Sequence, residues 1–199
     1  SNRVEHNYVS GAQSLVNDGA GITFDNCDGM TVLSNVVRDV HGNLHGAATN
    51  TGNYERKATG IYFGNGGSET NYIPITNTSV QDNVVTGCSD GILVDHEPGF
   101  EGNRVIGNTV FGCSENQLLM QDLGLQNFST YQAAYDTEVS SNILYCLDGH
   151  QRCLTESQTK ATALTGSRAI VDMGSFSDNA YFQPFCDVPI AYGLVSGDA

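Results

Sequence analysis

The chain has 199 residues, with 22 acidic and 8 basic side chains and a formal net charge of −14. This charge argues against nucleic acid and anionic membrane as partners, since both attract Lys and Arg, and it favours neutral over polyanionic glycans. The length suits one domain with a core, and no apolar run is long enough to span a membrane. Because the chain starts at Ser1 without Met, we expect residues 1–199 to be one domain of a processed chain or a piece of a longer protein.

A repeated pattern organises the sequence. Each unit begins with Gly-Ile and an apolar pair, passes a polar corner, and closes on Asn followed by Val, Ile or Thr. The closing residues are Asn2, Asn35, Asn83, Asn108, Asn142 and Asn179. The shortest unit, of about 25 residues, has the size of one rung, meaning one full circuit, of a β-solenoid. The sequence therefore predicts an all-β fold, a right-handed parallel β-helix of about six rungs with loop insertions.

The repeated Asn is expected to have a structural role. Asn tolerates left-handed backbone angles at a tight corner, and its amide can hydrogen-bond to the next Asn along the stack. The Val or Ile that follows each Asn is expected to point inwards and to stack on its counterpart one rung away. These residues are therefore assigned to the corner and to the core.

Residues 1–20 are predicted to form the start of the first rung, and residues 21–40 match the repeat without interruption and are predicted to form a complete rung. Residues 41–59 are rich in Gly and Asn, which disfavours a helix. They predict a surface loop in which His41 and His45 line a cleft and bind no metal.

The second half continues the pattern with insertions. Residues 60–88 predict an interrupted rung, 91–113 the clearest rung, and the unit from Asn116 a rung with a long insertion. Residues 154–168 are polar and rich in Thr, which predicts a loop. Two further apolar runs after 168 predict a last rung or an edge strand.

The six cysteines do not have the spacing of a zinc site. Cys88 and Cys113 occupy the same place in adjacent rungs, which is compatible with a disulfide or with two stacked buried thiols. Among Cys146, Cys153 and Cys186 we expect one disulfide. Two sequons, at Asn77 and Asn127, lie in insertions where a glycan can be tolerated. These features together predict a secreted, extracellular protein.

Stacking the units by their Gly-Ile starts places polar residues in columns along one ridge. The first column is Asp25, Gly64, Asp95 and Met120. The second column is Asn26, Asn65, His96 and Gln121. The third column is Cys27, Gly66, Glu97 and Asp122. Residues far apart in the sequence are thereby expected to share a strip of surface facing one groove.

Cleavage of a glycosidic bond needs two carboxyl groups, about 5 to 5.5 Å apart for retention or about 6.5 to 9.5 Å for inversion. Neighbouring rungs provide the first spacing, and rungs two apart approach the second. Asp95, Asp25 and Asp122 are therefore the candidate catalytic residues, with Gly64 leaving room for a sugar or a water. The candidate substrate-binding residues are His96, Asn65, Asn26, Gln121 and Glu97. The alternative is that these polar side chains only satisfy turn backbone.

The segments GIYFGNGG, NVV, SDGILVDHEPG and GNTVFGC resemble those of right-handed parallel β-helix repeat proteins, within them glycoside hydrolases of the β-xylosidase and α-fucosidase type. The resemblance implies that Asp95 takes the place of the acid/base carboxylate. The nucleophile position falls on Gly64, which has no carboxylate, so either Asp25 replaces it or the chain does not cleave.

The sequence thus predicts an extracellular protein that acts on or binds a neutral polysaccharide, without metal or cofactor. One alternative is a structural or adhesive module that self-associates through open solenoid ends. Another is a polysaccharide lyase, since pectate-lyase-like enzymes also contain Val-Asp-His. A lyase needs clustered carboxylates for Ca²⁺ and a basic residue, and Arg104 is the only one in the central rungs.

Overall fold

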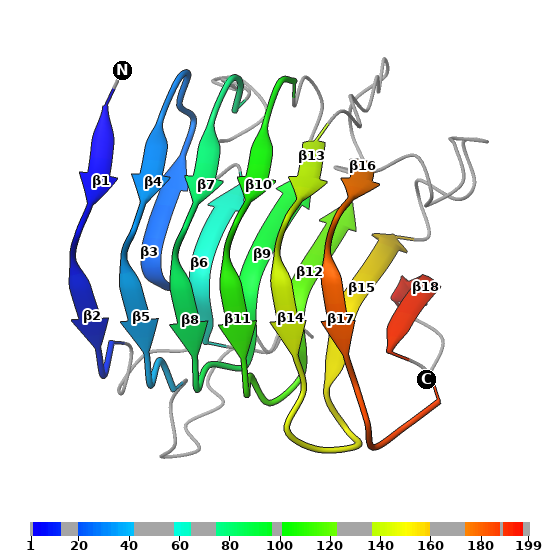
Figure 1. Ribbon diagram of the computed structural model, residues 1–199. Coiled ribbons are helices and arrows are strands. Elements are labelled where there is room, and N and C mark those ends of the chain that lie inside the picture. The colour runs from blue at the N-terminus through cyan, green and yellow to red at the C-terminus, as the bar shows by residue number, and fades with distance from the viewer. Residues whose placement is uncertain are drawn as a thin grey trace, which may run out of the picture.

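The computed structural model describes residues 2–12, 20–41, 58–64, 75–96, 101–122, 137–159, 174–187 and 189–196. Within these ranges the strands form three 6-stranded sheets in which every pairing is parallel. The chain winds through them as a right-handed parallel β-helix, and its colour passes from blue at one end of the stack to red at the other (Figure 1). The predicted fold is confirmed. No helix among the described residues is both long and apolar enough to cross a membrane.

Each rung contributes one strand to each sheet. The first sheet contains β1 (Arg3–Glu5), β4 (Thr31–Leu33), β7 (Ser79–Gln81), β10 (Arg104–Ile106), β13 (Thr137–Ser140) and β16 (Gly174–Ser177). The second contains β2 (Tyr8–Ser10), β5 (Val36–Arg38), β8 (Val84–Thr86), β11 (Thr109–Phe111), β14 (Ile143–Tyr145) and β17 (Ala180–Phe182). The third contains β3 (Ala20–Asp25), β6 (Thr59–Gly64), β9 (Asp90–His96), β12 (Asn116–Asp122), β15 (Arg152–Thr159) and β18 (Ile190–Ser196).

Two sequence predictions concern the last two rungs. The composition of residues 154–168 predicts a loop, but residues 154–159 belong to β15, so that part of the prediction is wrong, and residues 160–168 lie outside the described residues. The reason is that β15 pairs on both edges, with β12 and β18, and backbone pairing does not require apolar side chains. The predicted final rung is confirmed by β16, β17 and β18.

Asparagines form a ladder at the corner between the first and second sheets, and its four middle members are buried. Its members are Asn7, Asn35, Asn83, Asn108, Asn142 and Asn179. In each step the backbone N–H and the Nδ2 of one Asn both donate to the Oδ1 of the next, as between Asn83 and Asn108, where both distances are 3.0 Å. The predicted structural role of these residues is thus seen in the hydrogen bonds. The ladder starts at Asn7, however, and not at Asn2 as the sequence pattern suggested.

The left-handed backbone lies one residue before each ladder Asn. Ser34, Asp82 and Ser141 have φ values of 54°, 53° and 58°. The expectation that Asn itself adopts this conformation is therefore wrong. Because the chain turns at the preceding residue, the Asn side chain already points inwards, where its amide meets the next amide of the stack.

The side-chain alternation follows from this geometry. With the Asn amide pointing in, the next residue points out and the one after it points in. Ile143, which directly follows Asn142, is accordingly 49% exposed. The core column of the second sheet is made instead by the residues two positions after Asn, which are Val37, Val85, Val110 and Leu144. The predicted core column was displaced by one residue.

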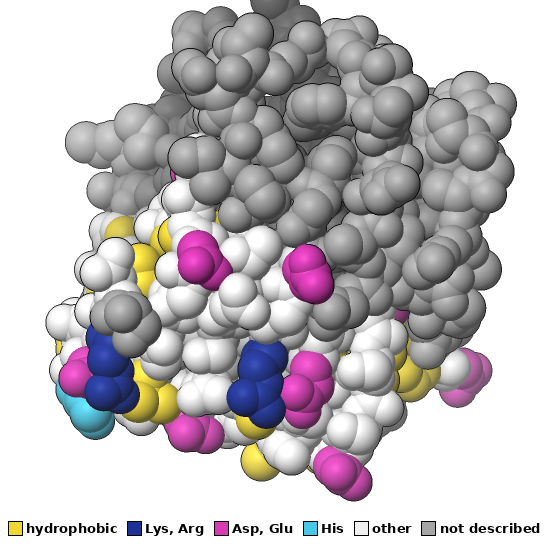
Figure 2. Space-filling model, turned by 90° about the horizontal axis from the view of Figure 1, so that it is seen from above, with side chains coloured by type: hydrophobic (Ala, Val, Ile, Leu, Met, Phe, Trp, Pro, Cys, Tyr) yellow, Lys and Arg dark blue, Asp and Glu magenta, His cyan; other side chains and the backbone are white. Residues whose placement is uncertain are grey.

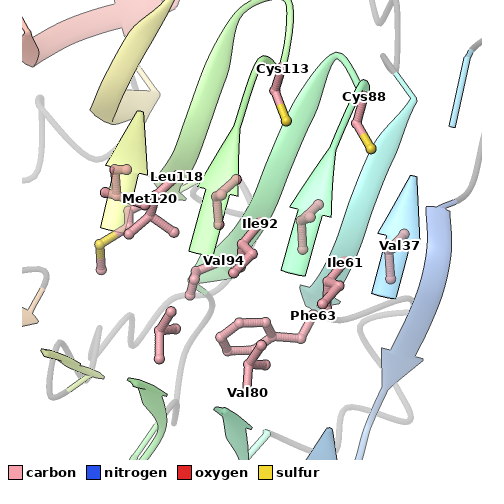
Figure 3. Close-up of a cluster of buried hydrophobic side chains, with 14 of the residues drawn as sticks. Val37, Ile61, Phe63, Val80, Cys88, Ile92, Val94, Cys113, Leu118 and Met120 are labelled. Carbon is pink, nitrogen blue, oxygen red and sulfur yellow. The ribbon is translucent and has the colours of Figure 1, made fainter. Parts of the chain in front are cut away.

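The third sheet provides the second half of the core. Phe63, Val94 and Met120 point into the interior from β6, β9 and β12 (Figure 3). The ring of Phe24, one rung earlier, stacks on that of Phe63 with centroids 5.3 Å apart. The same inward column continues to Glu156 in β15, a carboxylic acid that is fully buried.

Gly91 lies where the second and third sheets approach most closely. A Cβ at Gly91 would overlap the side chain of Val110 and lie 2.5 Å from the carbonyl oxygen of Gln117. Gly91→Ala is therefore expected to lower the free energy of unfolding by roughly 1 to 3 kcal/mol, measured by urea denaturation. Gly149→Ala is the matched control, because the nearest atom to its added Cβ is 3.4 Å away. Equal midpoints for the two variants would contradict this packing.

Candidate functional site

A column of residues crosses the outer face of the third sheet near the ends of its strands. Asp25 pairs with Gly64, the Cβ position of Gly64 lies 2.8 Å from Cβ of Asp95, and Gln121 pairs with both Asp95 and Ser157. The predicted alignment of Asp25, Gly64 and Asp95 is therefore present. Parallel strands in register bring together residues that are about 30 positions apart in the sequence.

The fourth member of the predicted column is wrong. Met120 pairs with Val94 and is buried in the core, and Gln121 occupies the place expected for it. The reason is that Gln117, not Asn116, is the counterpart of Gly91. The amide of Gln117 folds back on the preceding turn, where Oε1 accepts from the Cys113 N–H at 3.0 Å and Nε2 donates to the Cys113 carbonyl at 3.1 Å.

In the other two predicted columns, the residue from β12 is likewise displaced by one position. His96 pairs with Asp122, so Asp122 is displaced from Asp95 by one residue and not by two. For His96, Gln121 and Asp122 the structure describes the backbone only. The predicted binding residues Asn65 and Glu97 lie outside the described residues.

Asp95 is the least exposed carboxylate of the column, with 2% of its surface accessible. The hydroxyl of Tyr62, one rung away on the same face, donates to Asp95 Oδ2 at 3.0 Å. Asp25 is exposed at the end of β3. Next to it Asn26 has a left-handed φ of 51°, and its Oδ1 is buried without a hydrogen-bond partner.

The space above Gly64 was expected to be open to a sugar or a water. A Cβ at this position would collide with the Tyr62 hydroxyl and lie 2.6 Å from the Tyr62 ring carbon that carries it. The phenol of Tyr62 therefore occupies the gap between the rungs of Asp25 and Asp95. Glycine is needed here so that Tyr62 can reach Asp95, and the column is a continuous surface of Asp25, Tyr62 and Asp95.

A second polar group on this face was not singled out from the sequence. Asn116 Nδ2 donates to Asp90 Oδ1 at 2.6 Å, and Thr155 Oγ1 donates to Asn116 Oδ1 at 2.6 Å. Asp90 is buried at the start of β9, directly before Gly91. Asp90 could have been found from the sequence, because a polar residue also precedes the first Gly of the neighbouring unit, where Thr59 comes before Gly60.

The corners of the solenoid differ in the length of chain that they contain. Between the first and second sheets each corner has two residues, as at Ser34-Asn35. Between the third and first sheets the connections contain residues 26–30, 65–78, 97–103, 123–136 and 160–173. Variable connections on a regular scaffold are where binding residues concentrate. The column of Asp25, Tyr62 and Asp95 lies at the strand ends that lead into these connections.

Three arginines of the described surface, Arg3, Arg38 and Arg104, are paired with acids. Viewed from above, basic and acidic side chains lie side by side (Figure 2). Arg3 and Glu5 are 2.8 Å apart, and Arg104 and Glu138 2.9 Å. The bond from Arg104 holds the pKa of Glu138 below its usual value. Arg104 lies in β10 of the first sheet, so the basic residue that a lyase would need is not part of the column on the third sheet.

Two further sequence predictions fall only partly within the described residues. His41 is exposed, and His45 lies outside them, so the cleft predicted for this pair is not described. Asn77 is exposed at a corner with a φ of 51°, and its Nδ2 donates to Asp28 Oδ1 at 2.9 Å. The second sequon, at Asn127, lies outside the described residues, and glycosylation at both stays a prediction.

Comparison with known proteins gives one family. The model of the family described as periplasmic copper-binding protein (NosD) matches residues 4–166. No curated protein and no solved structure matches the chain. The family is periplasmic, which confirms the predicted location outside the cytoplasm. The resemblance to glycoside hydrolases stays a prediction.

The family description raises the question of copper. Copper sites are built from converging Cys, His and Met side chains, with weaker oxygen ligands. Among the side chains that the structure describes, no group of three or more His, Cys, Asp or Glu is placed to hold a metal ion. These residues do not fit a copper centre of that kind, and copper has no part in the function proposed below.

Proposed function

This chain belongs to the periplasmic NosD family, and from that premise we propose that it is an extracytoplasmic β-helix module that binds a neutral polysaccharide along the outer face of its third sheet. One observation carries the proposal. The phenol of Tyr62 and the carboxylate of Asp95 are joined by a hydrogen bond near the ends of β6 and β9, the strands that lead into the connections 65–78 and 97–103.

The chemistry of this surface suits sugars. A pyranose presents an apolar face that stacks on an aromatic ring, and hydroxyls that donate to a carboxylate. Tyr62 supplies a half-buried ring, Asp95 a carboxylate fixed by that ring's hydroxyl, and Asp25 an exposed carboxylate two rungs from Asp95. Repetition of such groups along a solenoid provides a linear surface for a linear chain.

The charge of the protein limits the kind of glycan. With a net charge of −14 and with Arg3 and Arg104 paired to acids, the described surface offers little attraction to uronates or sulfates. A neutral polysaccharide does not meet this repulsion. The proposal therefore names neutral chains such as xylan, arabinan, galactan or glucan.

Cleavage of the glycan by Asp25 and Asp95 is the finer hypothesis. Two features support binding over cleavage: Asp95 is 2% exposed, and Tyr62 fills the place between the two carboxylates. A hydrolase needs both carboxyl groups to reach the same glycosidic bond. The release of reducing ends from each glycan, with native protein and with Asp95→Asn, tests this hypothesis directly.

Binding is tested by affinity electrophoresis and calorimetry against the four neutral glycans. We expect one of them to bind the native protein, and Tyr62→Ala to weaken binding about tenfold or more, because the stacking surface is removed. Asp95→Asn should weaken binding about tenfold, because the Tyr62 hydroxyl loses the charge-assisted acceptor that orients the ring. Asp187→Asn, which removes an exposed carboxylate from the segment after β17, is the matched control and should leave binding unchanged.

Each variant is first compared with the native protein in its thermal unfolding, so that lost binding is not lost folding. Unchanged affinity in both Tyr62→Ala and Asp95→Asn would contradict the placement of the site. Failure of all four glycans to bind a folded native protein would contradict the proposed function itself.

A further inference from the structure

Two buried cysteines face one another at the corner between the second and third sheets. Cys146 directly follows β14 and Cys153 lies in β15, and both are 0% exposed. Their Sγ atoms are 3.4 Å apart. We propose that Cys146 and Cys153 are joined by a disulfide in the mature protein, while Cys186 stays a thiol. The sequence predicts one disulfide among Cys146, Cys153 and Cys186 but does not say which two cysteines form it. The contact between the sulfurs of Cys146 and Cys153 selects this pair.

The segment between the two cysteines is fixed by its own hydrogen bonds. The Leu147 N–H donates to Gln151 Oε1 at 2.7 Å, and the Gln151 side chain donates to Asp148 Oδ2 at 2.9 Å. The ends of this segment are therefore held together before any covalent bond forms. A disulfide requires the two sulfurs to approach from 3.4 Å to about 2.05 Å.

Cys186 has a different environment. It is half-buried, and Arg152 Nη1 contacts its Sγ at 3.8 Å. Cys88 and Cys113 lie on successive earlier rungs at the same corner (Figure 3), and Cys113 belongs to the rung next to that of Cys146.

The periplasmic location of the family provides the oxidising environment that the bond needs. The oxidant is a disulfide of a thiol oxidase or a small-molecule disulfide, written RSSR. One cysteine thiolate attacks RSSR and releases one RS⁻, giving a mixed disulfide. The second thiolate attacks the cysteine sulfur of that mixed disulfide and releases the other RS⁻. Two protons and two electrons leave the pair, and two RSH are formed.

The order of folding and oxidation follows from burial. Burial raises the pKa of Cys146 to about 12, so at neutral pH the folded reduced protein holds almost no thiolate there. Exchange is therefore expected to be faster before the fifth rung closes, while both thiols are accessible. Once formed, the bond is shielded from reductants by the same burial.

The test uses protein secreted into the periplasm, denatured in the presence of an alkylating agent without reductant. Digestion by trypsin with a glutamate-specific protease places Cys146 in peptide 139–152 and Cys153 in peptide 153–156, while Cys113 ends in 105–115. We expect mass spectrometry to find 139–152 linked to 153–156, with Cys186 alkylated. Alkylation of both Cys146 and Cys153, or linkage of Cys153 to the peptide that contains Cys186, would overturn the proposal.

A stability readout accompanies the map. Full reduction followed by refolding under reducing conditions should lower the unfolding temperature of the native sequence by roughly 5 to 10 °C. The Cys146→Ser/Cys153→Ser double variant should show no such shift, and Cys186→Ser should behave like the native sequence. The proposal would be contradicted by both measurements if reduction did not change the unfolding temperature of the native protein and the peptide map showed Cys146 and Cys153 as free thiols.

Discussion

Asn108→Ala is expected to lower the free energy of unfolding by about 4 kcal/mol. In the native ladder, Asn108 Oδ1 accepts from both the backbone N–H and the Nδ2 of Asn83, and its own Nδ2 donates to the carbonyl of Val80 and to Asn142 Oδ1. Alanine leaves the buried Asn83 N–H without its acceptor and removes one hydrogen bond each from Asn83 Nδ2, the Val80 carbonyl and Asn142 Oδ1. A lost hydrogen bond costs about 0.5 to 1.5 kcal/mol, and a buried group left without any partner about 1 to 3 kcal/mol. The midpoint of urea denaturation measures the loss.

Asn2→Ala is the matched control for this prediction, because Asn2 is exposed and is not part of the ladder. We expect it to change the free energy of unfolding by less than about 0.5 kcal/mol. A similar, small effect of both substitutions would mean that the amide ladder does not hold the rungs together.

The second large effect concerns Glu156, whose carboxyl is 0% exposed and whose two oxygens have no hydrogen-bond partner among the described residues. It points into the core in the column of Met120 and Val94. Pairing of β15 with β18 is irregular at this point, with a register shift between Thr155 and Ser157. Burial raises the pKa of Glu156 from 4.5 to about 7, and desolvation is the cause.

A raised pKa means that the folded protein holds the proton more tightly than the unfolded chain does. The contribution of Glu156 to stability is therefore fully present below about pH 4.5 and is lost as the pH rises to about 7. At pH 8 the folded state carries the cost of a buried carboxylate, roughly 3 kcal/mol from the difference between the two pKa values. We expect Glu156→Gln, which stays neutral, to be more stable than the native protein by up to that amount at pH 8.

The measurement is urea denaturation of both proteins at pH 5 and pH 8. The difference between them should be small at pH 5 and large at pH 8. Glu101→Gln serves as the control for a surface acid, because Glu101 is exposed. A difference between native protein and Glu156→Gln that does not change with pH would show that Glu156 does not titrate in the interior.

Most of the fold could be predicted from the sequence. The length of the units, the closing Asn and the Gly-Ile starts are each required by backbone geometry or by backbone hydrogen bonds. The Asn amides form a ladder, and Gly91 has no room for a Cβ. The errors of one residue, at the left-handed corner and in the core column, arise because the repeat identifies a corner but not which of its residues turns.

The site was less predictable, since it depends on how side chains fill the spaces that the register creates. The unit at Asn116 has Gln117 where others have Gly, and only the folding of its amide onto Cys113 shows the true register. Tyr62 covers Gly64, which no spacing rule predicts. Glu156 was read as part of a loop because a charged residue in a core column contradicts the usual pattern.

Hydrogen–deuterium exchange, measured with and without the neutral glycan that binds best, tests the central claim most directly. If the polysaccharide lies on the outer face of the third sheet, protection should increase in peptides covering residues 59–64 and 90–96 and stay unchanged in those covering 36–38 and 84–86 of the second sheet. Protection confined to the second sheet, or bound glycan without any change at β6 and β9, would contradict the account.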